Sequence, residues 1–399
     1  MELKPGYKQS EVGVIPEDWE VNSVVNLVSI TTGARNTQDK VKDGLYPFFV
    51  RSATVERINS FSFDGEAVLT AGDGVGTGKI YHYVKGKFDY HQRVYCMHSF
   101  NEQLDGYYFY LHFSNHFLSR VMAMTAKSSV DSVRREMIAN MKMPLPPLPE
   151  QRAIAAALSD TEALLSSLDR LLAKKRDIKQ AAMQQLLTGK QRLPGFSGKW
   201  ETKRLGEIGE IAGAGIDKKI RPNEVPVRLV NYLDVYRKDF ITSQDLHHFV
   251  TAAPIQASRC QVRKGDVFFT PSSEVRDDIA HSAVAMENIP GAVYSYHVIR
   301  LRPSDDWDLR FRAYVFKTKA FFDQAHMLCD GSGTRYVISQ SKFRAMTVLV
   351  PPIPEQTAIA VVLSDMDAEI DALQQRRDKT RALKQGMMLE LLTGRTRLV

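Results

Sequence analysis

The sequence has few cysteines and no long apolar segment. Its 399 residues include three cysteines, Cys96, Cys260 and Cys329, which are far apart and odd in number. This spacing offers neither a disulfide framework nor a metal-binding cluster, and we expect buried thiols in a reducing compartment. No apolar run approaches the roughly 18 residues needed to cross a bilayer, and Met1–Gly6 lacks the apolar core of a signal peptide. The sequence therefore predicts a soluble, cytoplasmic protein.

The sequence also lacks the motifs of common enzyme classes. The Gly-rich segment Gly72–Lys79 has Asp73 where a phosphate-binding Walker loop needs glycine, and Ile80 where it needs Ser or Thr. No Cys/His set has zinc spacing, no Gly-x-Ser-x-Gly elbow occurs, and no carboxylates cluster in a way that would hold Mg²⁺. The two Pro-Pro pairs continue as Leu148 and Ile353, where a DNA amino-methyltransferase motif has an aromatic residue. The chain is therefore predicted to do no chemistry itself.

The chain contains a tandem repeat, in which parts of the second half match the first half at one constant spacing. The matching stretches are Leu145–Ala155 with Val350–Ala360, Leu158–Asp160 with Leu363–Asp365, and Leu186–Gly189 with Leu391–Gly394. A fainter echo pairs Trp19 with Trp200 near the start of each half. The C-terminus lies where, in the first half, the next repeat begins, so we expect the two ends of the chain to lie near one another.

Each repeated segment predicts one long helix. Consecutive prolines disfavour helix before Glu150, and Pro149 suits the first helical position. Glu150 then complements the positive end of the helix dipole. Gly189 and Gly394 supply the left-handed residue that commonly ends a helix. About 38 residues at 1.5 Å each give a rod of roughly 57 Å.

Apolar residues recur at three- and four-residue steps along both predicted helices, as in the seam of a coiled coil. The seam positions are Ile154, Leu158, Leu165 and Leu168 in the first helix, and Ile359, Leu363, Ile370 and Leu373 in the second. Two such helices can bury their apolar stripes on each other. If the two halves of the chain form a ring with a pseudo-twofold axis, the helices must run antiparallel. The alternative is that each helix packs independently on its own domain.

The regions outside the repeated segments carry mostly strand signals. Short β-prone runs occupy comparable places in both halves, namely Glu66–Thr70 and Lys79–Val84 in the first, and Val267–Thr270 and Ala292–Leu301 in the second. Shorter helices are expected around residues 107–124 and 308–325. The two regions share this order of elements but little sequence, which predicts one scaffold with two different surfaces.

A formal net charge of +7 weakly favours a polyanionic partner. Candidate DNA contacts are basic and hydroxyl side chains in loop-like stretches, where they can donate to phosphates and reach base edges. The candidates are Thr77, Lys79, Arg93, Ser128, Ser129, Arg134, Arg135, Lys218, Lys219, Arg221, Ser272, Ser273, Arg276, Ser332, Thr334 and Arg335. The Gly-rich segment that contains Thr77 is expected to form a hairpin whose backbone can approach a groove closely. For any single charge, an ordinary solvated surface is the alternative.

The duplicated Pro-Glu-Gln…Leu-Ser-Asp…Leu-Leu-Thr-Gly element, at Pro149–Gly189 and Pro354–Gly394, resembles the specificity subunit of a type I restriction–modification system. The resemblance covers nearly the whole chain. With the repeat, it implies an α+β fold of two mixed α/β target recognition domains joined by two long antiparallel coiled-coil helices in a pseudo-twofold, circular arrangement. The expected divisions are recognition domains at 1–144 and 193–349, and helical spacers at 145–192 and 350–399.

The resemblance also implies a function. Each recognition domain of that family reads one half of a split DNA target, and the subunit itself is non-catalytic. S-adenosylmethionine then belongs to two methyltransferase (modification) subunits, and ATP and Mg to restriction subunits, so this chain is expected to bind no cofactor, no metal and no membrane. Two alternatives stay open: a stand-alone two-headed DNA-binding regulator, and a structural coiled-coil adaptor without a DNA role.

Overall fold

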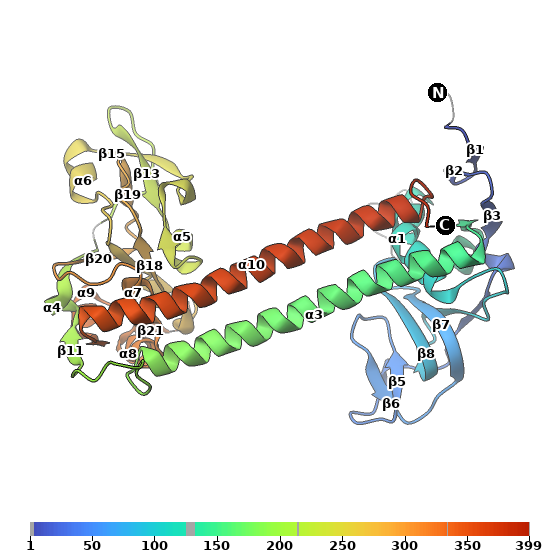
Figure 1. The fold of residues 1–399 in the computed structure, drawn as a ribbon, viewed down its shortest axis with the longest axis horizontal. Coiled ribbons are helices and arrows are strands. Elements are labelled where there is room, and N and C mark those ends of the chain that lie inside the picture. The colour runs from blue at the N-terminus through green and yellow to red at the C-terminus, as the bar shows by residue number, and fades with distance from the viewer. Residues whose placement is uncertain (1–3, 125–131, 214, 333, 399) are drawn as a thin grey trace. The chain divides into compact units, whose positions relative to one another are not determined.

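The computed structural model describes residues 4–124, 132–213, 215–332 and 334–398. The chain forms two compact units: unit 1 comprises Met1–Asp169 with Arg376–Val399, and unit 2 comprises Arg170–Gln375. The chain passes from one unit to the other only inside its two longest helices, α3 (Leu148–Leu186) and α10 (Ile353–Leu391) (Figure 1). Each unit therefore contains one mixed α/β region and one part of each long helix.

Unit 1 is built around a six-stranded sheet that packs against helix α1 (Gly106–Met124). The strand order is β4 (Ser29–Thr32), β9 (Val94–His98), β7 (Phe63–Ala71), β8 (Tyr81–Tyr90), β5 (Tyr46–Phe49) and β6 (Glu56–Ile58). All neighbours run antiparallel except β5 and β8. Phe109, Phe113 and Phe117 follow one another at four-residue steps on α1, so one face of this helix fills the core.

Smaller elements complete unit 1. The hairpin of β1 (Tyr7–Ser10) and β2 (Gly13–Pro16) precedes β3 (Glu20–Ser23). Strand β3 pairs with β10 (Lys142–Leu145), which leads directly into α3. Short helical turns are η1 (Val24–Asn26), η2 (Thr37–Asp39) and α2 (Arg135–Ala139).

Unit 2 holds several small sheets. A five-stranded sheet has the order β12 (Gly209–Ala212), β20 (Ile299–Pro303), β16 (Val267–Phe269), β18 (Ser282–Ala285) and β14 (Phe240–Ile241). Two three-stranded sheets have the orders β15 (Phe249–Ala252), β13 (Val225–Val230), β19 (Ala292–Tyr294), and β17 (Ser272–Ser273), β22 (Arg335–Val337), β21 (Asp330–Ser332). Strand β11 (Glu201–Arg204) pairs with β23 (Thr347–Val350).

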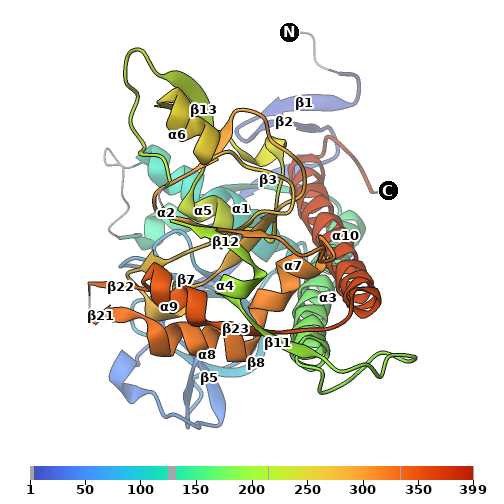
Figure 2. The ribbon, with the colours of Figure 1, turned by 90° about the vertical axis from the view of Figure 1, so that its left-hand side faces the viewer.

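The helices of unit 2, apart from its share of α3 and α10, are short. They are α4 (Leu205–Ile208), α5 (Tyr232–Tyr236), α6 (Pro254–Arg259), α7 (Phe311–Tyr314), α8 (Lys319–Leu328) and α9 (Gln340–Ala345), with the turns η3 (Ser243–Asp245), η4 (Arg276–Asp278) and η5 (Val315–Lys317). Helices α4 and α8 both contact α9, as Figure 2 shows.

Two sequence-based expectations for unit 2 were wrong in detail. The run Ala292–Leu301 forms two strands in different sheets, β19 and β20. Between them, Ser295 pairs in parallel with Ile216, whose carbonyl accepts from the Tyr296 N–H at 3.1 Å. The single helix expected over 308–325 is also interrupted. Thr318 begins a new helix there, since its side chain caps α8 by accepting from the Phe321 N–H at 3.2 Å.

The two long helices have the predicted length and ends. Each has 39 residues and begins directly after a Pro-Pro pair, one residue earlier than expected. Gly189 and Gly394 follow the helices with φ values of +68° and +69°, a backbone conformation that favours glycine. The repeat therefore specifies both ends of each helix through the same residue types.

The two helices run antiparallel in each unit, as the repeat predicted. In unit 1, Lys384 of α10 forms an ion pair with Glu162 of α3. In unit 2, Lys179 of α3 forms the corresponding ion pair with Asp367 of α10. The seam residues Ile154, Leu158, Leu165, Leu168, Ile359, Leu363 and Ile370 are buried, and Leu373 is half-buried.

The glutamate of the first repeat ties both ends of the chain together in unit 1. Glu150 is 1% exposed and accepts hydrogen bonds from Trp19 Nε1 at 3.0 Å and Arg397 Nε at 2.7 Å. The Tyr7 hydroxyl also donates to the Gly394 carbonyl at 2.9 Å. Residues near the N-terminus and the C-terminus therefore share one cluster in unit 1, which confirms the expectation that the two ends of the chain lie near one another.

An equivalent cluster occurs in unit 2, where no chain end is involved. Glu355, also 1% exposed, accepts from Trp200 Nε1 at 2.9 Å and from Arg192 Nη2 at 2.6 Å. The neighbouring glutamines, Gln151 and Gln356, each donate to the carbonyl of the first proline of their Pro-Pro pair, at 2.9 Å in both copies. The repeated Pro-Glu-Gln sequence is thus a structural anchor, a role that goes beyond the helix-dipole contact expected of Glu150.

The three cysteines are all buried. Burial raises the pKa of the Cys96 thiol to about 12, so this side chain behaves as an inert core residue. Across the part of the chain that the structure describes, every helix is too short or too polar to span a bilayer.

Candidate nucleic-acid interface

In unit 1, the predicted Gly-rich hairpin is a loop between β7 and β8 with a fixed base. The Val133 N–H donates to the Gly72 carbonyl at 2.7 Å, which ties the loop to the segment that precedes α2. Arg51 and Arg93 both pair with Asp73, with Nη1–Oδ distances of 2.8 and 3.3 Å. Two exposed guanidinium groups are therefore held on either side of the same carboxylate at the base of the loop.

Three sequence candidates lie on or beside this loop, and one of them has a structural role. Lys79 and Arg93 are exposed, so their charges are accessible to a polyanion. Thr77 is only 2% exposed, and its hydroxyl donates to the Gly74 carbonyl at 2.6 Å. Thr77 was expected to contact DNA. Instead it stabilises the loop, because its side chain is buried and its hydroxyl bonds within the turn.

The segment before α2 supplies the other candidates of unit 1. Arg134 and Arg135 are exposed at the start of this helix. Ser128 and Ser129 lie outside the described residues. Because residue 133 is bonded to the loop base, Arg134 and the Gly-rich loop belong to one surface.

Unit 2 repeats the same backbone arrangement with different side chains. After strand β16, the Pro271 carbonyl accepts from the Ile338 N–H at 2.9 Å, and Ser272 pairs with Val337. Ile338 occupies the place in the second repeat that Val133 occupies in the first. The two units therefore share a backbone anchor, and it carries residues of another kind in each unit.

A cleft of about 630 Å³ lies next to this anchor in unit 2. Its lining combines aromatic, apolar, hydroxyl and charged side chains, namely Tyr232, Leu233, Tyr236, Ser272, Ser273, Glu274, Val275, Asp278, His297, Thr334 and Arg335. Four of these residues, Ser272, Ser273, Thr334 and Arg335, are sequence candidates for DNA contact. We refer to this feature as the unit 2 cleft.

Two further candidates lie next to the unit 2 cleft. The Arg276 guanidinium stands 5.3 Å from the ring centre of Tyr336. Ser332 pairs with Arg335 across the hairpin of β21 and β22, and Arg335 Nη2 donates to the Ser272 hydroxyl at 3.1 Å. The structure thus brings together residues that are more than 60 positions apart in the sequence.

The unit 2 cleft has a positive electrostatic character at one side. Burial lowers the pKa of His297, and the charges of Lys218 and Arg335 lower it further. A bound phosphate would offset those charges. Lys219 and Arg221 are less available, since both form ion pairs with acidic residues of their own segment, at 3.4–3.6 Å.

Sequence reasoning missed the aromatic and apolar part of the cleft. Tyr232 and Tyr236 stack with ring centres 5.8 Å apart, and the Tyr236 hydroxyl donates to Asp278 at 2.9 Å. Leu233 is 49% and Val275 53% exposed, so the cleft offers apolar contact as well as hydrogen bonds. The four-residue spacing of the tyrosines was the available signal, since it places both on one face of a helix.

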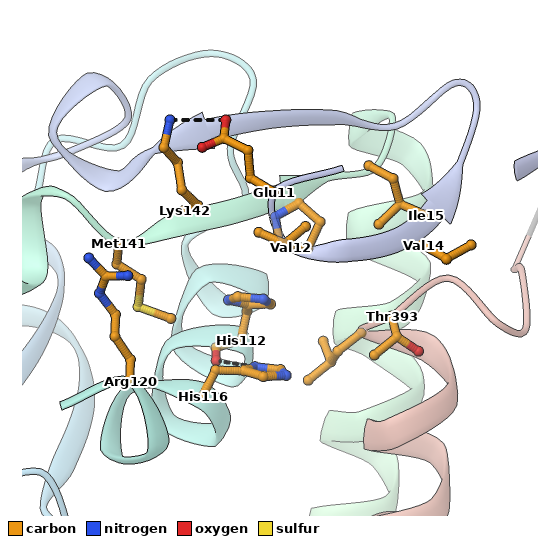
Figure 3. A pocket seen from close by; sticks show the side chains of 12 residues that line it. Glu11, Val12, Val14, Ile15, His112, His116, Arg120, Met141, Lys142 and Thr393 are labelled. Atoms are coloured by element: carbon orange, nitrogen blue, oxygen red, sulfur yellow. Dashed lines mark hydrogen bonds and ion pairs between the residues drawn. The ribbon is translucent and has the colours of Figure 1, made fainter. Parts of the chain in front are cut away.

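A second pocket, of about 270 Å³, lies in unit 1 between the β1–β2 hairpin, α1 and the end of α10 (Figure 3). The rings of His112 and His116 stack there with centres 4.3 Å apart. Burial, together with the neighbouring His116, holds the pKa of His112 well below its ordinary value and keeps it neutral. Among the described residues, no three His, Cys, Asp or Glu side chains are placed to hold a metal ion.

The sequence of the chain matches one protein family over most of its length. Residues 16–175 and 197–380 match the family described as "Type I restriction modification DNA specificity domain". The EcoDI specificity subunit of Escherichia coli is 22% identical over 91% of this chain and 84% of its own length. The MjaVIII specificity subunit of Methanocaldococcus jannaschii is 22% identical over 96% of this chain and 94% of its own length.

Solved structures share the fold. The S subunit of the type I restriction–modification system from M. genitalium covers 98% of each chain with a TM-score of 0.60 and 14% identity. A chain from a type I system described in terms of complex assembly and conformational transition gives a TM-score of 0.58 and 17% identity, over 95% of this chain and 99% of its own. The chain therefore belongs to the family of type I restriction–modification specificity subunits and carries two DNA-recognition domains.

Proposed function

We propose that the chain reads an asymmetric, bipartite DNA target in the cytoplasm as a non-catalytic subunit, and that each unit contacts one half-site. The observation that carries this proposal is the backbone anchor shared by both units, which presents a Gly-rich loop in unit 1 and the unit 2 cleft in unit 2. One scaffold with two dissimilar surfaces suits two dissimilar half-sites. The surrounding arginines and lysines suit the phosphates on either side.

Within the unit 2 cleft, the roles follow from chemistry. Arg335 is exposed and held by Ser272, so its guanidinium can donate two hydrogen bonds to a guanine edge or to a phosphate. Leu233 and Val275 can contact a thymine methyl group, and Asp278 can accept from an exocyclic amine. We assign base contacts to this cleft and phosphate contacts to Lys218 beside it.

The first prediction tests this cleft. Arg335→Ala is expected to relax one base position of one half-site and to weaken binding by about 1–3 kcal/mol, because a bidentate base contact is lost. Sequencing of methylated bases in a host that expresses the chain with its methyltransferase measures the half-sites. The matched control is Arg310→Ala, an exposed arginine of the same unit beside α7. Relaxation in both half-sites, or in neither, would contradict the assignment.

We further propose that the repeated helices dock two copies of a methyltransferase, which carries S-adenosylmethionine, and that restriction subunits with ATP and Mg join the full complex. Ile178 and Leu383 hold the same place in the two repeats, and they are 44% and 60% exposed. Leu383 also borders an apolar pocket of about 500 Å³ in unit 1. Two equivalent exposed apolar positions suit two copies of one partner.

The second prediction separates the two docking positions. Leu383→Glu and Ile178→Glu should each lose one methyltransferase copy, and the double variant both, because each buries a charge at the contact. Analytical ultracentrifugation of the co-purified complex measures the stoichiometry, and Ile255→Glu on α6, 72% exposed in the native chain, is the control. A DNA-binding regulator or a coiled-coil adaptor would co-purify with no methyltransferase even as the unaltered chain.

A further inference from the structure

Val75 has an unusual place at the tip of the Gly-rich loop of unit 1. Its side chain is 97% exposed, the highest fraction among the large hydrophobic residues of the described chain. Glycine lies on both sides of it, at Gly74 and Gly76, so no neighbouring side chain covers it. An apolar side chain that is almost wholly in water, on a surface rich in arginine, has no role in the packing of this unit.

The loop holds Val75 in a defined position. The N–H of Thr77 donates to the Gly74 carbonyl at 3.0 Å, and the N–H of Lys79 donates to the Gly76 carbonyl at 3.0 Å. A Cβ at position 76 would lie 2.6 Å from the Arg51 carbonyl, so glycine lets the loop pack directly on the backbone below it. Gly74 has a φ of +82°, which adds a tight turn beside Val75. The exposed valine is thus presented by an ordered loop.

The surroundings of Val75 identify the kind of ligand. A Cβ at position 74 would lie 4.0 Å from Arg51 Nη1, so one guanidinium stands next to the loop tip, and Arg93 lies at the loop base. Arg51 and Arg93 share the single carboxylate of Asp73, so one positive charge is left to attract a polyanion, whereas Val75 can offer only apolar contact. In the major groove of DNA, the thymine 5-methyl is the apolar group at the base edges.

We infer that Val75 is a specificity-determining residue that contacts a thymine methyl in the half-site read by unit 1. This inference rests on the proposed function, in which the Gly-rich loop faces DNA. The neighbouring glycines let the backbone enter the groove, and Arg51 and Arg93 contact the flanking phosphates. Val75 then selects thymine over cytosine, which lacks the methyl group.

The first test compares methylated-base sequencing for the unaltered chain and for Val75→Ala, each expressed with its methyltransferase. One position of one half-site should change from thymine to either pyrimidine, while the other half-site stays the same. Val14→Ala, an exposed valine of the β1–β2 hairpin in the same unit, is the matched control and should change neither half-site. An unchanged target for Val75→Ala overturns the inference, even though DNA recognition by the chain would stand.

The second test removes the other partner of the contact. In duplexes with the target found for the unaltered chain, that thymine is replaced by deoxyuridine, which lacks only the methyl group. The unaltered chain should bind the altered duplex about fourfold more weakly, as for the loss of one buried methyl, and Val75→Ala should bind both duplexes equally.

The remaining outcomes of this second test are also decisive. If Val75→Ala remains as sensitive to the missing methyl as the unaltered chain, another residue makes the contact and the inference fails. If neither protein is sensitive and Val75→Ala binds both duplexes weakly, the valine acts as a wedge between base pairs, which also overturns it. If the unaltered chain directs no sequence-specific methylation, the proposed function itself fails, so the two failures are distinguishable.

Discussion

Arg397→Ala is expected to destabilise unit 1 by about 3–5 kcal/mol, because it leaves the Glu150 carboxylate buried without its opposite charge. Glu150 is 1% exposed, and Arg397 supplies two hydrogen bonds to it, from Nε at 2.7 Å and Nη2 at 2.8 Å. Trp19 Nε1 remains as a donor at 3.0 Å, but it carries no charge. Urea unfolding measures the loss, and hydrogen exchange over residues 7–20 places it in unit 1.

Two other variants make this result specific. Arg192→Ala removes the equivalent partner of Glu355, so a similar loss should appear in unit 2 and leave residues 7–20 protected. Arg395→Ala is the control, since this arginine has a 61% exposed side chain and lies 3.9 Å from its carboxylate partner. An exposed pair of this kind contributes about 0–1 kcal/mol. Equal losses for Arg395→Ala and Arg397→Ala would show that the buried charge is not the cause.

The cluster around Glu150 also shows what the sequence could and could not predict. The sequence predicted two long helices and their glycine ends, because apolar periodicity and helix-terminating residues are local signals. It also predicted the antiparallel pairing of these helices, because the duplication implies a pseudo-twofold arrangement. The partners of Glu150 were not predictable in the same way. Trp19 and Arg397 are far from it in sequence, and only the folded chain brings them to one carboxylate. The repeat predicted that the two ends of the chain lie near one another, but it did not identify the residues that bond there.

The candidate interface was predicted less completely than the helices. Hydroxyl and basic residues in loops could be selected by type, and Ser272 and Arg335 do meet at the unit 2 cleft. Thr77 was wrong as a surface residue because a hydroxyl can equally bond its own turn, which residue type does not reveal. Tyr232 and Tyr236 were missed because they resemble core aromatics in the sequence. They line the cleft together with the loop that follows β16, a neighbour that their four-residue spacing does not identify.

Lengthening both long helices by one heptad is expected to abolish recognition of the original spacer while leaving both half-sites unchanged. The chain passes between the units only within α3 and α10, so added helix changes the spacing of the two reading surfaces. Seven residues add about 10.5 Å, which corresponds to about three base pairs of rise. They also keep the seam nearly in phase, since a heptad is close to two helical turns.

The site of insertion follows from the antiparallel register. Asp169 pairs with Arg377 at 3.6 Å and Lys175 pairs with Glu369 at 2.6 Å, so positions after Leu172 and after Leu373 lie opposite one another between these pairs. Inserting seven residues at both positions preserves the ion pairs on either side, whereas one insertion alone would shift the register of the seam.

The control for the heptad variant carries the same seven residues after Gly198, between the end of α3 and β11, and should keep the original spacer.

Three added base pairs also turn the duplex by about 100°, given 10–10.5 base pairs per turn, whereas a heptad turns each long helix through nearly two full turns. The original spacer therefore fails in both distance and angle. A target whose half-sites and spacer are both unchanged in the heptad variant, read by sequencing of methylated bases, would show that the paired helices do not set the spacing.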